Sequence, residues 1–239
     1  MKTSQMQVML VDSMGTDLSI VNAARVSFDK ESEWVSTFDK TTPVGVDWDM
    51  RGTKLFQLKD SDAKLISYLA KHNHWSPFAH TSIQLRVKAP IFVARQLVKH
   101  QVGGVWNEVS KRYVDSEPEF YFPEVWRGRP VNAKQGSSGV IDDPMWGQAA
   151  HEHVKNCLSW YESAIAAGVA PEQARMILPQ NMQTEWYWTG SLMFFVRVCR
   201  ERLAPGAQQE TREVAEQIAE IVAPLFPVSW SALMETKGI

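Results

Sequence analysis

The chain has 239 residues, of which 44% are hydrophobic and 22% are charged, as in a globular protein with one large domain or two small ones. Its net charge of −2 and isoelectric point of about 6.3 argue against nucleic acid as the main partner. It has no apolar run long enough to cross a membrane, no charged-then-apolar leader, and only two cysteines, so we expect a cytoplasmic protein.

The first third of the chain predicts two short helices and two strands. A strand is expected over residues 6–11, a helix capped by Thr16 or Asp17 to about residue 25, and a second helix capped by Asp60 or Ser61 to about residue 71. Ile83, Leu85 and Val87 alternate with polar residues, which predicts a strand with one wet face. Between these elements, residues 30–58 mix charges, Pro, Gly and Trp without a period and are interpreted as an insert loop.

The rest of the chain continues the alternation of helices and strands. Pro90 stands where a helix begins, and Gly103-Gly104 stands where we expect that helix to end. Further elements are predicted as strands over 119–122 and 183–188 and as helices over 144–167, from 171, over 191–203 and over 207–225. Residues 127–143 are rich in Gly, Pro and Ser and are interpreted as a second insert loop. The pattern predicts one α+β domain over residues 1–239, with a small mixed sheet packed by helices.

The stretch from Arg95 to Tyr113 holds the densest set of polar side chains. On the helix expected after Pro90, Gln96, Lys99 and His100 are spaced by three and four residues and therefore share a face, which can hold a planar, charged ligand. A solvated helix face is the alternative. Ser110 and Arg112 follow, and a hydroxyl beside a guanidinium is suited to binding phosphate.

Three other polar clusters have both a structural and a functional interpretation. His72, His74 and His80 match no zinc-binding spacing, so we expect no metal. Glu172 and Arg175 form either a surface ion pair or part of a ligand site. On the helix expected from residue 191, Arg197 can pair with Glu201. Arg202 has no acidic residue one turn away, which makes it the better candidate for a ligand contact.

These clusters together resemble the flavin-dependent thymidylate synthases. The family signature reads Arg-His-Arg, a short spacer, then Ser followed by x-Arg-Tyr, and here it corresponds to Lys99-His100-Gln101 and Ser110-Lys111-Arg112-Tyr113. The resemblance covers most of the chain, in order, through the segments 14–17, 23–27, 74–80, 88–90, 94–96, 174–175, 178–179, Arg202 and 207–208.

The resemblance implies a homotetramer whose active sites lie between subunits, with bound FAD, dUMP as substrate, methylenetetrahydrofolate as carbon donor and NADPH as reductant. It makes Arg202 the catalytic residue. The residues implied for dUMP are Gln96, Lys99, Glu108, Ser110, Lys111, Arg112, Arg175 and Arg202. The residues implied for FAD are Ser27, His74, Ser76, Lys99, His100, Gln101, Val102, Asn107, Glu108, Ser191 and Arg197.

The signature departs from the family pattern at two positions. Lys99 keeps a cation but loses the guanidinium fork, and Gln101 loses a charge. The spacer to Ser110 is one residue longer. A flavin- or nucleotide-binding homologue that lacks synthase activity therefore stays open as an alternative. A single-strand binding module that uses the basic residues around Trp106 is a further alternative, against which the acidic isoelectric point argues.

The cysteines bear on the mechanism, because one route to thymidylate adds a cysteine to C6 of uracil. Cys157 and Cys199 both lie inside predicted helices, and neither follows a proline. We therefore expect a route without a protein nucleophile, in which the flavin supplies the redox chemistry. Arg202 is expected to stabilise negative charge at N3 and O2 of uracil, while Ser110 and Arg112 hold the 5′-phosphate with help from Arg175. His74 is expected to help position the folate.

Overall fold

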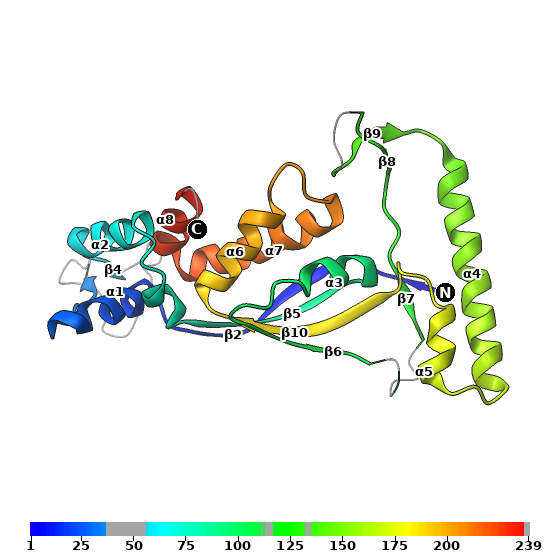
Figure 1. Ribbon diagram of the computed structural model, residues 1–239, viewed down its shortest axis with the longest axis horizontal. Coiled ribbons are helices and arrows are strands. Elements are labelled where there is room, and N and C mark those ends of the chain that lie inside the picture. Colours follow the sequence, from blue (N-terminus) through cyan, green and yellow to red (C-terminus); the bar gives the residue numbers. More distant parts are fainter. Residues whose placement is uncertain (37–55, 111, 113–116, 132–134, 237–239) are drawn as a thin grey trace, which may run out of the picture. The chain divides into compact units, whose positions relative to one another are not determined.

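A computed structural model describes residues 1–36, 56–110, 112, 117–131 and 135–236. The chain divides into two compact units, each built from three stretches of sequence. The first unit comprises Met1–Val11, Gln84–Thr189 and Val198–Ala219. The second comprises Asp12–Ile83, Gly190–Arg197 and Glu220–Ile239. Both contain helices and short strands, so the predicted α+β class is confirmed (Figure 1).

A four-stranded sheet, most of which belongs to the first unit, has the strand order β2-β5-β10-β6. Its strands are β2 (Gln7–Met14), β5 (Ser82–Pro90), β10 (Gln183–Gly190) and β6 (Gly104–Glu108), and they lie side by side in Figure 1. The strands predicted over 6–11, around Ile83–Val87 and over 183–188 are confirmed. Strand β6 was not predicted, because it falls in the stretch interpreted as a polar helix followed by a glycine loop.

The two faces of this sheet differ in the way that the alternation predicts. Leu85 and Val87 of β5, with Trp186 and Trp188 of β10, are buried. On the opposite face, Arg86 Nε lies 2.6 Å from Glu185 Oε1. One face is therefore part of the core, and the other carries charged side chains.

Helix α4 (Pro144–Ala166) is the longest helix of the first unit (Figure 1). It is followed by α5 (Pro171–Ala174) and a 3-10 turn, η3 (Arg175–Ile177). Strands β1 (Lys2–Thr3) and β7 (Glu119–Phe120) pair in parallel. A core cluster joins these elements, formed by Phe120, Val154, Leu158, Tyr161, Ala174, Leu178 and Met182. Burial of this apolar surface holds α4 against the β7 region.

The two predicted insert loops contain paired strands. Strand β8 (Trp126–Gly128) pairs antiparallel with β9 (Ser138–Ile141), so the interpretation of 127–143 as a loop is wrong at both ends. The Gly- and Ser-rich composition correctly predicts the bend but gives no sign of the two short strands on either side of it. The register of this strand pair shifts between Arg127 and Gly128. At the ends of the other insert, β3 (Val35–Ser36) pairs with β4 (Phe56–Gln57), and residues 37–55 lie outside the described residues.

The second unit contains α1 (Asp17–Arg25), η1 (Val26–Phe28), α2 (Asp60–Lys71), η2 (Ser76–Ala79) and α8 (Pro227–Glu235). Thr16 caps α1 as predicted, and it forms a capping box with Ser19. The predicted cap of α2 is wrong, because the N-cap is Lys59, whose side chain forms no capping hydrogen bond.

Helix α8 was not predicted, because prolines at 224 and 227 obscure the helical period. The first free backbone N–H groups of α8 form hydrogen bonds with a side chain of another helix, α1. The N–H groups of Val228 and Ser229 donate to the carboxylate of Asp17 on α1 at 3.0 and 2.9 Å. A carboxylate at a helix N-terminus accepts hydrogen bonds from the free N–H groups, and its negative charge is attracted to the positive end of the helix dipole.

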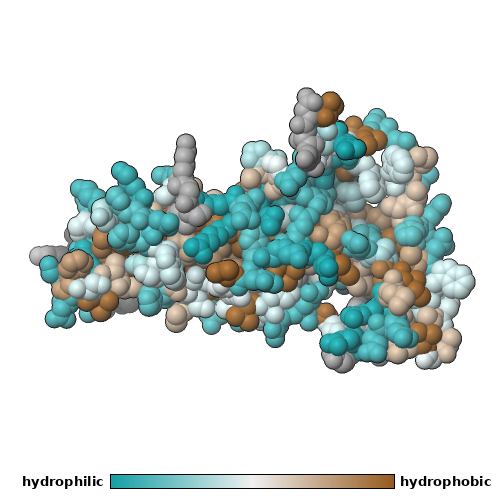
Figure 2. All heavy atoms as spheres, in the orientation of Figure 1, coloured by the Kyte–Doolittle hydropathy of each residue, from teal (hydrophilic) through white to brown (hydrophobic). Residues whose placement is uncertain are grey.

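Helices α6 (Leu192–Arg202) and α7 (Gln209–Leu225) complete the fold, and both were predicted. Within the first unit they contact each other where the thiol of Cys199 points to the carbonyl of Ala215 at 3.6 Å. In the part of the chain that the structure describes, no helix is both long and apolar enough to cross a membrane. Hydrophilic residues cover much of the face shown in Figure 2, with apolar residues scattered among them.

Candidate active site

Helix α3 (Ile91–Leu97) begins after Pro90, as predicted, but it ends before the Gly103-Gly104 pair. Lys99 and His100 follow in turns whose N–H groups bond to carbonyls three residues back, at 3.4 and 3.0 Å. The prediction that Gln96, Lys99 and His100 share one helix face is therefore wrong. The sequence carries no stop signal at Val98, so the helical period extends past the true end of the helix.

The imidazole of His100 contacts the guanidinium of Arg202. Arg202 Nε donates to His100 Nε2 at 2.9 Å, across 102 positions of sequence. Both side chains are largely buried, with exposed fractions of 10% for His100 and 23% for Arg202. Arg202 has no acidic residue one turn away, as the sequence shows, but Glu201, which directly precedes it, places Oε2 3.7 Å from its guanidinium.

The protonation state of His100 follows from these surroundings. Burial and the positive charge of Arg202 lower its pKa below the ordinary 6.5, while Glu201 opposes the shift. The imidazole is therefore neutral at pH 7, and Nε2 is free of hydrogen and accepts the bond from Arg202. A neutral histidine orients Arg202 without repelling it.

We expect this histidine to make the fold sensitive to acid. The unfolded chain binds a proton at His100 as the pH falls through about 6.5, whereas the folded chain resists doing so, so the free energy of unfolding falls below that pH. Urea unfolding at pH 7.5 and 5.5 measures the loss. The His100→Gln variant should lose less stability across this interval than the unmodified chain. An equal loss in both proteins would contradict the assigned protonation state.

Strand β6 places Glu108 beside β10. Thr184 donates to Glu108 Oε1 at 2.7 Å, and the indole of Trp106 donates to Oε2 at 3.2 Å. Trp106 in turn stacks on the buried Trp186, with ring centroids 4.1 Å apart. Both carboxylate oxygens of Glu108 are therefore held in place. Neither Trp106 nor Thr184 was singled out from the sequence as a partner of Glu108, because strand pairing brings them to it.

Ser110 and Arg112, the predicted phosphate residues, contact each other. The Ser110 hydroxyl accepts from Arg112 Nε at 3.2 Å and from its backbone N–H at 3.3 Å. Lys111 lies outside the described residues. Gln101 and Val102, which precede β6, and Asn107, near its end, are exposed.

Arg175 and Glu108 line the same pocket of about 520 Å³. Of the two interpretations of Glu172 and Arg175, the ion pair is not what the structure shows, because Arg175 Nε donates to the backbone carbonyl of Glu172 at 3.2 Å. Glu117, Glu119, Glu172 and Glu185 also line this pocket. Lys88 lines it as well, but its Nζ lies 2.6 Å from Glu119 Oε2, so an anion that entered the pocket would be attracted mainly by the guanidinium of Arg175.

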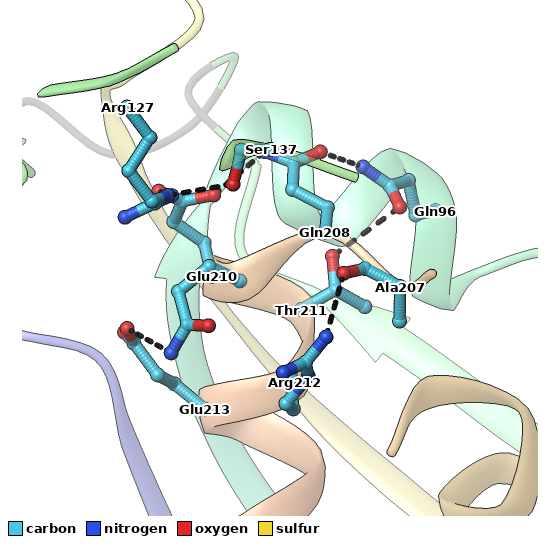
Figure 3. A network of polar contacts seen from close by, with 10 residues as sticks. Gln96, Arg127, Ser137, Ala207, Gln208, Glu210, Thr211, Arg212 and Glu213 are labelled. Carbon is cyan, nitrogen blue, oxygen red and sulfur yellow. Dashed lines mark hydrogen bonds and ion pairs between the residues drawn. The ribbon is translucent and has the colours of Figure 1, made fainter. Parts of the chain in front are cut away.

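Gln96 belongs to a network of polar side chains drawn in Figure 3. Its amide nitrogen donates to Gln208, and its amide oxygen accepts from the hydroxyl of Thr211 at 3.3 Å. Gln208 donates to Glu210 at 2.8 Å, and Glu210 pairs with Arg127 of β8. The sequence marks Gln208 only as part of the family series, and it marks neither Glu210 nor Arg127.

Five residues predicted for the flavin lie in the second unit. Ser27 is in the exposed turn η1, beside the exposed Val26 and Phe28. His74 and Ser76 flank Trp75, of which 53% is exposed. Ser191 lies between β10 and α6, and its hydroxyl accepts a hydrogen bond from the N–H of Phe194 at 3.3 Å, so it caps the start of α6. Arg197 is half-buried on α6.

Comparison with known proteins decides the family. The model of the family described as thymidylate synthase complementing protein matches residues 9–228. The chain belongs to this family. A flavin-dependent thymidylate synthase of Thermus thermophilus is 40% identical over 228 residues, covering 95% of this chain and 75% of the relative. That of Kosmotoga olearia is 35% identical over 230 residues, covering 95% and 89%.

A solved structure agrees with this membership. The crystal structure of a UMP/dUMP methylase, PolB from Streptomyces cacaoi, bound with 5-Br dUMP, superposes with a TM-score of 0.79. It is 28% identical in sequence, and the match covers 99% of this chain and 98% of that one. The resemblance to the flavin-dependent thymidylate synthases is thus confirmed at the level of the family. The individual site residues stay predictions.

Proposed function

We propose that this chain catalyses the reductive methylation of dUMP to dTMP, with FAD bound, methylenetetrahydrofolate as carbon donor and NADPH as reductant. Membership of the family of flavin-dependent thymidylate synthases supports the reaction class. The contact between Arg202 and His100 is the structural observation that carries the proposal, because it brings the proposed catalytic cation to the signature histidine.

The residues around His100 suit a flavin chemically. A flavin needs apolar contacts for its ring and donors for its phosphates, and this segment offers exposed Val102 and Val105 near Lys99 and Asn107. Lys99, His100, Gln101 and Asn107 would hold the cofactor, which supplies hydride transfer when bound.

The chain's own residues would bind dUMP and stabilise charge. Ser110 and Arg112 would bind the 5′-phosphate, since their contact already aligns a hydroxyl with a guanidinium. Arg202 would stabilise negative charge at N3 and O2 of uracil, with its guanidinium oriented by the neutral His100. A cationic donor that is already in place does not have to reorganise as the charge develops.

The cysteines support a route without a protein nucleophile. Cys199 is fully buried, and burial raises the pKa of its thiol, which disfavours the reactive thiolate. Cys157 lies on α4, 3.5 Å from His153. Both thiols are free of disulfides, which fits the cytoplasmic location proposed for the protein.

We also propose that residues 1–239 act as one catalytic domain, with inserts at about 30–58 and 127–143, in a homotetramer with shared sites. The family match spans residues 9–228 and so includes both units, which supports a single functional domain. A monomeric mass in light scattering of the purified protein would contradict the assembly.

Lys99 and Gln101 favour one competing function, a flavin- or nucleotide-binding homologue without synthase activity. The visible absorption spectrum of the protein with added FAD, followed by NADPH and dUMP without oxygen, tests the redox half of the proposal. We expect a bound-flavin spectrum that NADPH bleaches. If no flavin binds, the two replacements have abolished the cofactor site and the competing function, as a nucleotide-binding homologue, gains support.

A further inference from the structure

A second pocket of about 520 Å³ is lined by residues of the first unit alone, and none of them is among the residues proposed for dUMP or FAD. Its walls come from α3, α4, β8 and the start of α7. A pocket of this volume is in the range that binds small organic molecules. The residues of its walls indicate which kind of molecule fits.

Aromatic rings form much of the lining, from Phe92, Tyr121, Phe122 and Trp126. The rings of Phe92 and Tyr121 contact each other with centroids 6.3 Å apart, and Phe122 stacks on the imidazole of His151 at 3.8 Å. These contacts hold three of the four rings in place. Aromatic rings stack on nucleobases and on other flat heterocycles, so this lining suits a planar ligand.

The charges of the lining argue against an anionic ligand. Within the described residues, Arg127 is the only lysine or arginine of the lining, and it is paired with Glu210. The two charges cancel, so the pocket has no excess positive charge to offer a phosphate group. We therefore expect an uncharged occupant.

The ion pair of Arg127 and Glu210 can form further hydrogen bonds (Figure 3). The guanidinium has five N–H donors, of which Nε donates to Ser137 at 3.0 Å and Nη2 to Glu210 in the described part of the chain, so three are left. The carboxylate has about four acceptor positions and accepts from Arg127, Gln208 and its own backbone N–H, so about one is left. A ligand that completes this pair presents two neighbouring acceptors beside one donor.

We propose that this pocket binds the 6-oxopurine base of an uncharged nucleoside, such as inosine or guanosine. Along one edge, such a base presents acceptors at N7 and O6, which an arginine can bond together, followed by a donor at N1. Arg127 would donate to the two acceptors, and Glu210 would accept from N1. The site is separate from those proposed for dUMP and FAD, so the inference goes beyond the proposed function and does not depend on it.

Calorimetric titration of inosine into the protein saturated with FAD and dUMP tests the inference, because ligands then fill the other proposed sites. Inosine should bind with one molecule per chain. Adenosine should bind at least about tenfold more weakly, because its amino group at C6 would face the N–H donors of Arg127. Inosine 5′-monophosphate should bind no more tightly than inosine, and tighter binding would contradict the preference for an uncharged ligand.

Ala150→Phe fills the pocket without removing any of its polar groups, since Ala150 is half-buried on α4 and belongs to the lining. Ala149→Phe is the matched control, because Ala149 is exposed on the same helix and is not part of the lining. Inosine binding should be lost in the first variant and unchanged in the second. Far-ultraviolet circular dichroism shows whether both are folded.

Arg127→Lys is measured as well, in case Ala150→Phe fails to fold. It keeps the counter-ion of Glu210 but loses the planar fork, so the preference for inosine over adenosine should shrink. The inference would be overturned if folded protein did not bind inosine saturably, bound adenosine equally well, or kept its inosine affinity in Ala150→Phe or its preference in Arg127→Lys. A protein that binds neither FAD nor dUMP would instead contradict the proposed function, and inosine is then titrated without them.

Discussion

Replacing Arg202 by alanine is expected to reduce the turnover of dUMP by about 10²–10³-fold, the usual cost of removing one preorganised donor to a developing negative charge. Arg202 is largely buried, and the neutral His100 holds its guanidinium in place, so the group is oriented before any substrate arrives. The loss should fall on kcat more than on the KM for dUMP, because the charge develops during the reaction.

The measurement is dTMP formation by the variant, with the flavin absorption and the far-ultraviolet circular dichroism recorded on the same preparation. Arg200→Ala is the matched control, since Arg200 lies on the same helix, is half-buried and is absent from the proposed site. Arg202→Lys keeps the charge but not the planar fork, and it should recover only part of the activity. Turnover near that of the unmodified enzyme in folded, flavin-bound Arg202→Ala would contradict the assigned role.

Replacing Asp62 by alanine is expected to lower the free energy of unfolding by about 3–5 kcal/mol, as when one partner of a buried ion pair is removed. Asp62 is fully buried on α2. One of its oxygens binds the guanidinium of Arg25, and the other accepts from the hydroxyl of Ser32 at 2.5 Å. Without the carboxylate, Arg25 would keep a largely buried charge without its partner.

Urea unfolding of Asp62→Ala tests this, with Asp60→Ala as control because Asp60 is exposed on the first turn of the same helix. The control should change stability by less than about 1 kcal/mol. Arg25 and Ser32 flank the turn that carries Ser27, so we also expect weaker FAD binding in Asp62→Ala. If Asp62→Ala is no less stable than Asp60→Ala, the buried pair does not hold this segment.

Local patterns in the sequence predict those elements whose signals are themselves local. The cap at Thr16, the apolar period of α4 and the alternation in β5 were all readable, and the structure confirms them. The early end of α3 was not readable, since nothing in the local sequence marks Val98 as a stop. Helix α8 was missed because prolines obscure its period, and because the carboxylate that stabilises its start belongs to Asp17, 211 residues away in sequence.

For the site residues too, the sequence predicted what local motifs mark and missed what depends on distant contacts. The order of the motifs predicted Arg202 and His100, but not that they touch, because their contact depends on the packing of α6 beside the turn after α3. Glu210 and Arg127 carry no motif that singles them out. They join Gln208 in one polar network because α7 and the β8–β9 pair bring them together, which only the tertiary structure shows.

The most direct test of the proposed function is dTMP formation from dUMP by the purified protein with FAD, NADPH and methylenetetrahydrofolate, in the absence of oxygen. We predict that dTMP appears in step with the oxidation of NADPH, and that none forms when either the folate or dUMP is omitted. A flavin that NADPH reduces, with no dTMP formed under any of these conditions, would contradict the proposal and identify a flavin-binding homologue without synthase activity.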